Sequence, residues 1–465
     1  MTALTDPPVP GTLAGLRLQP ALAGATAALV ASAAPFPFST EPLRLSVAAR
    51  DQMAETCAAF VAGVDVLHSA YRDDPAGLTA LLRLPPHLAE LWDALPAEDW
   101  AVIARPDVLL AGSRTLIIDV NASSHAGLFA LSDLLVRAQQ EWAAATRRPG
   151  PPIPAPVVPP LAELLRARTA DPDGLVVLSY FAAERVGGVN WFDWYYQQLA
   201  WELRRCGMPV RIAAAEELTV ESGRVLLGGR PVGLVYRFFG VPALGSPEWT
   251  VLERVVGAAR AGVVGLFTDF RGELFAVKVV LALLSDERTR PLLGDALADR
   301  LARALPWTRV LERRTTEVAG RTVDLPGYVL EHRRETVLKP AAGHGGDRVH
   351  IGAECTPAQW TAAVTAALAD PQPWLVQELV LADPSEVAVA RPDGTVERRL
   401  LPVVFGAFLL ERRLVGAIGR HGVGGPGRLN INGHLGVIPT PVTWTADPPS
   451  TATRRRGGRP MRHVT

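Results

Sequence analysis

The spacing of apolar residues changes several times along the chain, which predicts helices and strands in mixed order. Across residues 46–71 apolar side chains recur at intervals of three and four, the spacing of an amphipathic helix. Residues 115–121 instead form a short apolar run that ends in polar residues, which is typical of a buried strand. We therefore expect residues 1–148 to be mostly helical, interrupted by an apolar strand.

A proline-rich stretch, residues 149–165, follows this helical region, and its composition favours a stiff, extended connector. Residues 166–262 then alternate apolar strands with a helix and contain a hairpin turn at Gly228 and Gly229. This alternation predicts a small α/β domain with a partly parallel sheet. Its expected elements are strands at 175–180 and 210–213, a helix at 191–206 and a hairpin at 224–239.

Residues 263–445 mix helices and strands again, so the whole chain is expected to be of the mixed α/β (α+β) class. The remaining residues, 446–465, are polar and basic, and we expect them to be disordered. The expected helices are 276–284 and 357–369, and the expected strands are 337–339, 374–378, 403–410 and 414–418.

Composition limits the classes of partner. The 465 residues are 48% hydrophobic and carry no net charge, which gives no reason to expect a nucleic acid. Three widely spaced cysteines, Cys57, Cys206 and Cys355, lack metal-ligand spacing and suggest free thiols in a reducing compartment. Asp6 argues against a signal peptide, and no apolar run reaches the roughly 20 residues that span a membrane. We expect a cytoplasmic protein without a membrane partner.

The chain has 47 basic residues, of which only Lys278 and Lys339 are lysines. Lys339 ends a short apolar strand, and the following loop contains Gly343, Gly345 and Gly346, whose backbone N–H groups can approach phosphate oxygens closely. A lysine ammonium is a compact charge that suits a single phosphate oxygen. The alternative is that both lysines are solvated surface residues retained by chance.

Two further segments carry polar residues at strand ends. The strand at 374–378 ends in Gln377 and Glu378, which could offer backbone groups to an adenine edge and a carboxylate to a ribose, or be an ordinary strand end.

Asp119 and Asn121 point to one face of their strand, because side chains alternate, and Asp107 on a neighbouring antiparallel strand could add a third oxygen. Two carboxylates and an amide suit Mg²⁺. The alternative, a hairpin with solvated acids, fits the apolar surroundings poorly.

In this order and spacing the motifs resemble those of the circularly permuted ATP-grasp ligases, especially the synthetase domain of glutathionylspermidine synthetase. The resemblance covers about residues 100–440. Asp119 stands where that family usually has glutamate. The matching positions are Arg105-x-Asp107, Asp119-x-Asn121 twelve residues after Asp107, a loosely similar helix from Lys278, Lys339-Pro340 with Gly343 and Gly346, Gln377-Glu378, and the final strands that end at Arg420.

The resemblance implies a circularly permuted ATP-grasp fold. Residues 1–148 would supply a helical region plus the permuted metal-binding strands, 166–262 a pre-ATP-grasp α/β domain, and 263–445 the nucleotide-binding domain. It also implies that ATP phosphorylates a carboxylate to an acyl phosphate, which an amine then attacks to give an amide. The implied partners are a small-molecule carboxylate and an amine. Separately from the resemblance, a homodimer is one possible oligomer.

The same resemblance assigns roles to the residues, with ATP and Mg²⁺ as cofactors. Arg105 would stabilise the transferred phosphoryl group, and Arg420 would close over it from a mobile loop. The nucleotide would be held by Lys278, Lys339, Gly343, Gly345, Gly346, Gln377 and Glu378, and the metal by Asp107, Asp119 and Asn121.

Two other functions are compatible with these residues besides that of a ligase. A non-catalytic nucleotide-binding partner protein is supported by Asp119, and an ATP-grasp kinase would use the same residues. A GxGxxG sequence at Gly422, Gly424 and Gly427 does not indicate a dinucleotide site, because Pro426 lies inside it and no helix is expected to follow. Arg237 and Arg271 are candidates for binding a substrate carboxylate or for structural ion pairs. His344 and His434 are candidate general bases or simple turn residues.

Overall fold

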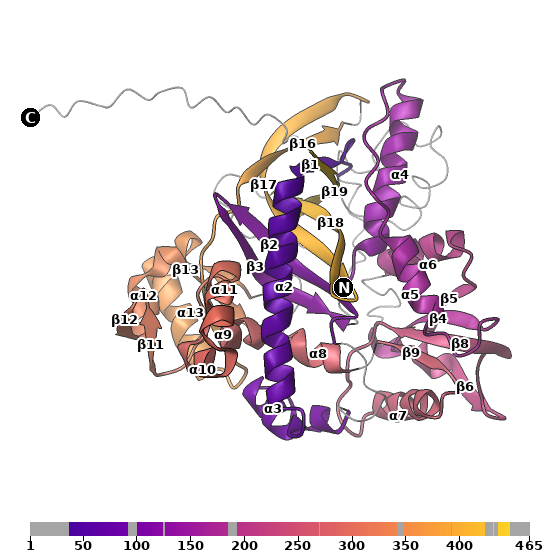
Figure 1. Ribbon diagram of the computed structural model, residues 1–465, viewed down its shortest axis with the longest axis horizontal. Coiled ribbons are helices and arrows are strands. Elements are labelled where there is room, and N and C mark those ends of the chain that lie inside the picture. Colours follow the sequence, from indigo (N-terminus) through magenta and orange to yellow (C-terminus); the bar gives the residue numbers. More distant parts are fainter. Residues whose placement is uncertain are drawn as a thin grey trace, which may run out of the picture.

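The computed structural model describes residues 37–91, 100–123, 126–184, 193–268, 270–341, 348–391, 393–423, 431 and 436–446. Within them the chain forms sheets of seven, six, four and two strands with helices packed against them (Figure 1). The predicted mixed α/β class is therefore confirmed. The predicted tail, 446–465, lies outside the described residues except for its first residue. The predicted division into domains stays a prediction.

The seven-stranded sheet joins strands from the two ends of the chain. Its hairpin β2–β3 turns at Gly112, whose φ of +60° lies in the left-handed region that glycine favours. Strand β2 also pairs with β17, so the early hairpin is hydrogen-bonded to late strands. The strands are β1 (Leu43–Ser46), β2 (Ile103–Ala111), β3 (Arg114–Ala122), β16 (Pro384–Ala390), β17 (Val396–Leu410), β18 (Arg413–Gly422) and β19 (Val437–Thr445).

Helix α2 (Val47–Ala70) lies across one face of this sheet (Figure 1). Ser46 begins it, because the serine side chain accepts the N–H of Ala49 at 3.1 Å, as an N-cap does. Its buried residues, including Phe60 and Val64, share a hydrophobic core with Phe405 of β17. The predicted helix at 46–71 is thus confirmed, and it leaves the opposite face of β2 and β3 open to other elements.

A six-stranded sheet forms the predicted small α/β unit. Strands β5, β4, β8 and β9 run parallel, while β6 and β7 add an antiparallel hairpin, so the partly parallel sheet is confirmed. Its elements are β4 (Leu175–Tyr180), α6 (Asp193–Arg205), β5 (Val210–Ala214), β6 (Leu218–Glu221), β7 (Arg224–Leu227), β8 (Arg230–Arg237), α7 (Pro247–Arg260) and β9 (Gly265–Phe267).

The predicted connector at 149–165 is wrong in its second half, because helix α5 (Val158–Arg166) occupies it. Two prolines are compatible with this helix because they lie in its first turn, where backbone N–H groups have no intrahelical partner. Asp133 of α4 (Phe129–Ala145) accepts the N–H groups of Val157 and Val158 at 3.0 and 2.9 Å and so caps the helix. That contact spans more than 20 residues, which local composition could not reveal.

The four-stranded sheet, β10 (Thr308–Val310), β15 (Trp374–Glu378), β13 (Thr336–Pro340) and β14 (His350–Ile351), completes the site-forming framework. Helices α12 (Leu325–Glu331) and α13 (Pro357–Ala369) cover one of its faces. The helix predicted at 276–284 is α9 (Val279–Ser285), which starts after Lys278. The other elements are α3 (Pro75–Leu81), α8 (Arg271–Phe275), α10 (Arg290–Leu293), α11 (Asp295–Ala304), β11 (Thr315–Val318) and β12 (Arg321–Asp324).

None of the helices in the described ranges is long and apolar enough to cross a membrane.

Candidate functional site

The hairpin β2–β3 places four of the predicted site residues on one face of the seven-stranded sheet. Asp107 lies directly opposite Asp119, and Arg105 lies opposite Asn121. Because residues two apart on a strand share a face, all four side chains project to the same side. The pairing of Asp107 with the Asp119 strand, expected from alternation, is confirmed.

Two arginines bind the Asp107 carboxylate. Arg105 Nη1 lies 2.6 Å from Oδ1, and Arg420 Nη2 lies 2.6 Å from Oδ2. The prediction that Arg420 acts from a loop is wrong, because it lies within strand β18 and is paired on both sides. Burial would raise the pKa of Asp107, but the two guanidinium groups hold that pKa below its usual value. Burial also lowers the pKa of Arg105, against the opposing effect of Asp107. The carboxylate is therefore ionised at neutral pH, with a guanidinium on each oxygen.

Gly406 makes room for Arg105. It lies opposite Asp107 on β17, and a Cβ atom at this position would be 3.0 Å from Arg105 Cδ and 3.2 Å from Nη1. Such distances are shorter than ordinary van der Waals contact. The Arg105 side chain can therefore reach Asp107 across the sheet only because position 406 is a glycine.

The two lysines reach this face from different elements. Lys278, just before α9, has its Nζ 3.7 Å from Asp119 Oδ2, and its backbone N–H donates to Ala341 O after β13. Lys339 Nζ donates to Ile118 O at 3.2 Å and to Gln377 Oε1 at 2.7 Å. Both lysines thus lie against strand β3, although 61 positions separate them in the chain.

A β-bulge explains why Ile118 can accept from Lys339. The β2–β3 register shifts between Asp107 and Val108, which pair with Asp119 and Ile117, so Ile118 has no partner in the ladder. Its carbonyl oxygen is directed to the lysine instead. Because Gln377 belongs to β15, Lys339 links the seven-stranded and four-stranded sheets.

The pKa of Lys339 is lowered to about 8, mainly by burial and in part by nearby Lys278, while Asp119 and Asp107 act in the opposite direction. An ammonium with two acceptors in this setting has one N–H group left among the contacts that the described residues make. An anionic ligand would accept a hydrogen bond from that N–H group and would stabilise the charged form of the lysine.

We call Arg105, Asp107, Asp119, Lys278, Lys339 and Arg420 the cationic cluster. It contains four basic groups and two carboxylates, an excess of two positive charges. Gathering like charges in a partly buried site is costly, and a bound counter-charge offsets that cost. The cluster is therefore suited to a polyanion.

The oxygen donors of this face fit Mg²⁺ that is shared with a ligand. Asn121 Nδ2 donates to Arg105 O at 3.3 Å, and this bond does not use its side-chain oxygen. Within the described ranges, no group of three or more His, Cys, Asp or Glu side chains could hold a metal ion. Two carboxylates and one amide oxygen form a partial shell, which suits magnesium because this ion retains waters and binds phosphate oxygens.

Gln377 and Glu378 separate onto opposite faces of β15. Gln377 is buried beside Lys339, whereas Glu378 accepts two hydrogen bonds from Arg114, at 2.6 and 3.1 Å. Burial would raise the pKa of Glu378, but Arg114 holds that pKa below its usual value. The backbone N–H of Glu378 donates to Trp307 O, so an adenine edge would have to meet other backbone groups of this segment.

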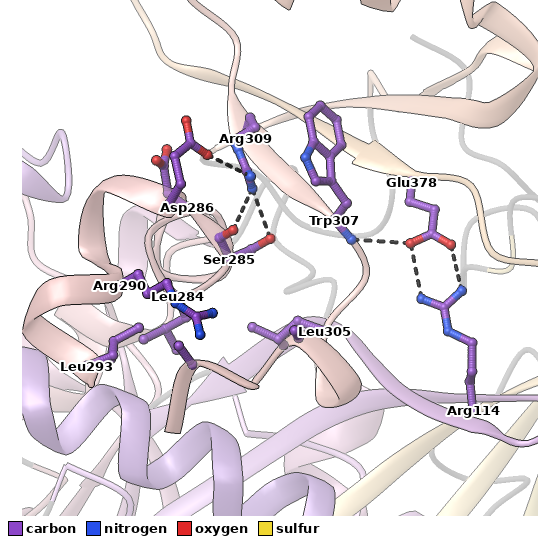
Figure 2. Close-up of a pocket in the computed structure, with 13 residues that line it drawn as sticks. Arg114, Leu284, Ser285, Asp286, Arg290, Leu293, Leu305, Trp307, Arg309 and Glu378 are labelled. Carbon is purple, nitrogen blue, oxygen red and sulfur yellow. Dashed lines mark hydrogen bonds and ion pairs between the residues drawn. The ribbon is translucent and has the colours of Figure 1, made fainter. Parts of the chain in front are cut away.

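Figure 2 shows a pocket of about 310 Å³ beside Glu378, at the edge of the four-stranded sheet. Leucines 284, 293 and 305 form its apolar side. Its charged side chains are already paired, since Arg114 binds Glu378 and Arg309 lies 2.8 Å from Glu287. This pocket therefore lacks the excess charge of the cationic cluster.

Arg237 does not lie free to bind a substrate carboxylate. It is fully buried, and its guanidinium donates hydrogen bonds to other groups of the protein. This supports the alternative that Arg237 forms a structural ion pair. Arg271 is also buried. The hydrogen bonds of Arg237 join Nε to Thr268 O at 2.6 Å, Nη1 to Phe239 O and Glu273 Oε1 at 3.0 Å each, and Nη2 to Ser123 Oγ at 2.7 Å.

Several sequence predictions fall outside the described residues. They are Gly343, Gly345, Gly346, His344, His434, Gly424 and Gly427.

Sequence reasoning missed Gly406 and Thr308, of which Thr308 contacts Gln377. Gly406 lies within an apolar strand without any turn signal, and Thr308 belongs to no motif. Neither position carries a local pattern that could have identified it.

Comparison with known proteins gives distant structural likenesses. No protein-family model matches the chain, and no curated protein matches it. A glutathione synthetase-like effector from Globodera pallida, in its apo form, has 11% sequence identity over 83% of each chain, with a TM-score of 0.48. The ATP-grasp ligase PsnB, complexed with minimal precursor, has 13% identity over 53% of this chain and 85% of its own, with a TM-score of 0.27. With both scores below 0.5, a functional conclusion depends on the cationic cluster instead.

Proposed function

We propose that the protein is an ATP-dependent carboxylate–amine ligase with a circularly permuted ATP-grasp fold. The observation that supports this most is the cationic cluster, with its excess of two positive charges around two carboxylates. The magnesium complex of ATP carries about two negative charges near neutral pH and so complements this excess. The cluster also brings together residues from five of the six motifs of the family resemblance, and Gln377 of the sixth accepts a hydrogen bond from Lys339.

In this proposal Lys278 and Lys339 hold phosphate oxygens, and Arg105 and Arg420 stabilise the charge that develops on the transferred phosphoryl group. A cation about 4 Å from a phosphate oxygen interacts by roughly 4 kcal/mol at an effective dielectric constant near 20. Asp107, Asp119 and Asn121 would hold magnesium, which when bound offsets charge on the phosphates. Arg105 and Arg420 can serve both Asp107 and a phosphate, because each guanidinium has several N–H donors.

The proposed reaction has two steps. A carboxylate oxygen of the donor attacks the γ-phosphorus of ATP, and the bond to ADP breaks, which leaves an acyl phosphate. The amine then attacks the acyl carbon, phosphate leaves, and the nitrogen loses a proton to give an amide. The residues of the chain contribute position and charge rather than covalent chemistry, as in other phosphoryl transfers.

A second candidate is a nucleotide-binding protein without catalysis. It is favoured by the guanidinium groups on both oxygens of Asp107, which a metal ion would have to displace in part. Asp119 also favours this candidate, because its side chain is shorter than the glutamate that the family usually has at this position.

The test is ADP release by the purified protein with Mg–ATP and pools of amino acids, small peptides, polyamines and organic acids. We expect stimulated release that Lys339→Ala reduces by about 100- to 1000-fold, because a transition-state contact is lost. Arg290→Ala is the matched control, since Arg290 pairs with Asp295 and Asp299 at the surface and lies outside the cluster.

Mass spectrometry of the product separates an amide from a phosphorylated compound. Stimulated release that survives Lys339→Ala would refute the assignment. ATP binding with no stimulated release in any pool would support the non-catalytic candidate.

A further inference from the structure

The side chain of Gln377 can bind Lys339 in only one of its two orientations. A glutamine amide ends in one oxygen acceptor and one nitrogen donor of similar size. With Oε1 at 2.7 Å from Lys339 Nζ, the contact is a hydrogen bond. The reversed amide would direct two N–H donors at an ammonium, which repels them. Something in the protein must therefore select the observed orientation.

Thr308 supplies that selection. Its hydroxyl donates to Pro306 O at 2.9 Å, so the hydroxyl proton is committed and the oxygen can only accept. Gln377 Nε2 lies 3.1 Å from this oxygen and donates to it. The hydrogen bonds consequently run in one direction, from Lys339 to Gln377, from Gln377 to Thr308, and from Thr308 to the Pro306 carbonyl.

Thr308 is itself held firmly. It lies directly opposite Gln377 in the β10–β15 ladder and is 1% exposed. Its backbone N–H donates to Ser285 Oγ at 3.0 Å, which connects β10 to the end of α9. Both ends of the contact with Gln377 are therefore fixed by backbone structure, and a reversed amide would leave its nitrogen without this acceptor.

We propose that Thr308 is a positioning residue for Lys339: by orienting the Gln377 amide, it holds the ammonium on the face where phosphates bind. This inference rests on the proposed function, because it deepens the role of the phosphate-binding lysine. It predicts that loss of one hydroxyl outside the cationic cluster weakens nucleotide binding through the lysine.

The test uses the fact that the chain has only two lysines, Lys278 and Lys339. Protein labelled with ¹³C at Cε and ¹⁵N at Nζ of lysine should give two lysine side-chain signals, and Lys278→Arg identifies the signal of Lys339. Thr308→Val keeps the shape of the side chain and removes the acceptor. We expect it to shift the Lys339 signal and to weaken ATP binding by about tenfold, typical of losing a hydrogen bond that supports a charged group.

Thr308→Ser restores the hydroxyl and should restore both the signal and the affinity. Thr316→Val is the matched control, because Thr316 is equally buried and accepts from Arg309 Nε at 2.8 Å, away from Lys339. A Lys339 signal unchanged in Thr308→Val, or changed equally in Thr316→Val, would overturn the inference. A shift specific to Thr308→Val in a protein that does not bind ATP would support the positioning role and refute the proposed function.

Discussion

The protein contains two clusters of charged side chains that differ in their balance. The balanced network consists of Asp286, Glu287, Glu312, Arg288, Arg309 and Arg314, three carboxylates and three guanidinium groups joined by ion pairs of 2.5 to 3.2 Å. Arg83 also pairs with Glu312, but it is exposed and solvent screens its charge, so we do not count it in the balanced network. The cationic cluster has four basic groups for two carboxylates. The ion pairs of the balanced network join residues of the fold to one another, whereas under the proposed function a bound polyanion offsets the charge excess of the cationic cluster.

Arg314→Met would break the balanced network, and we expect the largest effect on stability from it. Arg314 Nη2 lies 2.5 Å from Asp286, a carboxylate that is almost completely buried. Without Arg314 the buried Asp286 carboxylate keeps, among the described residues, only Arg288 as an ion-pair partner, and losing one partner of a buried ion pair costs up to about 3 kcal/mol of unfolding free energy. Urea denaturation would measure this loss. ATP affinity of the folded variant should remain that of the wild type, and reduced affinity at unchanged stability would contradict the division into two clusters.

Lys278→Met tests the opposite expectation for the cationic cluster. The ion pair with Asp119 is partly buried but loose, at 3.7 Å, and contributes about 1 kcal/mol or less, while removal of the lysine relieves repulsion with Lys339. We therefore expect nearly unchanged urea stability but about tenfold or greater loss of ATP affinity, measured by calorimetry. Lys278→Arg should retain part of the affinity because it keeps the charge. A large loss of stability without loss of binding would place Lys278 in a structural role.

The sequence predicted correctly those secondary-structure elements whose bounds are determined by local patterns. Strands β4 and β15 and helix α13 have the predicted bounds, since apolar spacing and caps act within a few residues. Alternation along a strand also sufficed to place Asp107 with Asp119. The contact of Arg420 with Asp107 follows from pairing of β18, β17 and β2, and the Ile118 bulge from the register of a hairpin. The first feature depends on the packing of distant segments and the second on the exact register of one hairpin. Neither leaves a signal in the local sequence.

The pH dependence of ATP binding should separate Lys339 from the permanently charged arginines. Its pKa of about 8 means that it loses its proton as pH rises through 8, so affinity should be about tenfold lower at pH 9 than below pH 7. Lys339→Arg should flatten this profile. A profile as steep in Lys339→Arg as in the wild type would assign the titration to another group.

Stability should respond to the same lysine in the opposite sense. The pKa of Lys339 is lowered in the folded state relative to its usual value of 10.5, so between about pH 8 and 10.5 the unfolded chain binds more protons. The cost of burying the charged lysine is present below pH 8 and is relieved as pH rises. The unfolding free energy of the wild type, compared with that of Lys339→Met, should therefore rise across this window.

Gly406→Ala should give the smallest effect, because the side chain that it crowds is flexible. The new Cβ would lie 3.0 Å from Arg105 Cδ, so the arginine must move by a few tenths of an ångström away from Asp107. We expect a loss of a few-fold in ATP-dependent ADP release and a change in unfolding free energy below about 1 kcal/mol. Gly257→Ala in helix α7 is the control, since its Cβ would meet nothing within 4 Å and alanine favours the helix. A variant at Gly406 that loses stability but retains full ADP release would show that the close fit around Arg105 serves folding rather than the reaction.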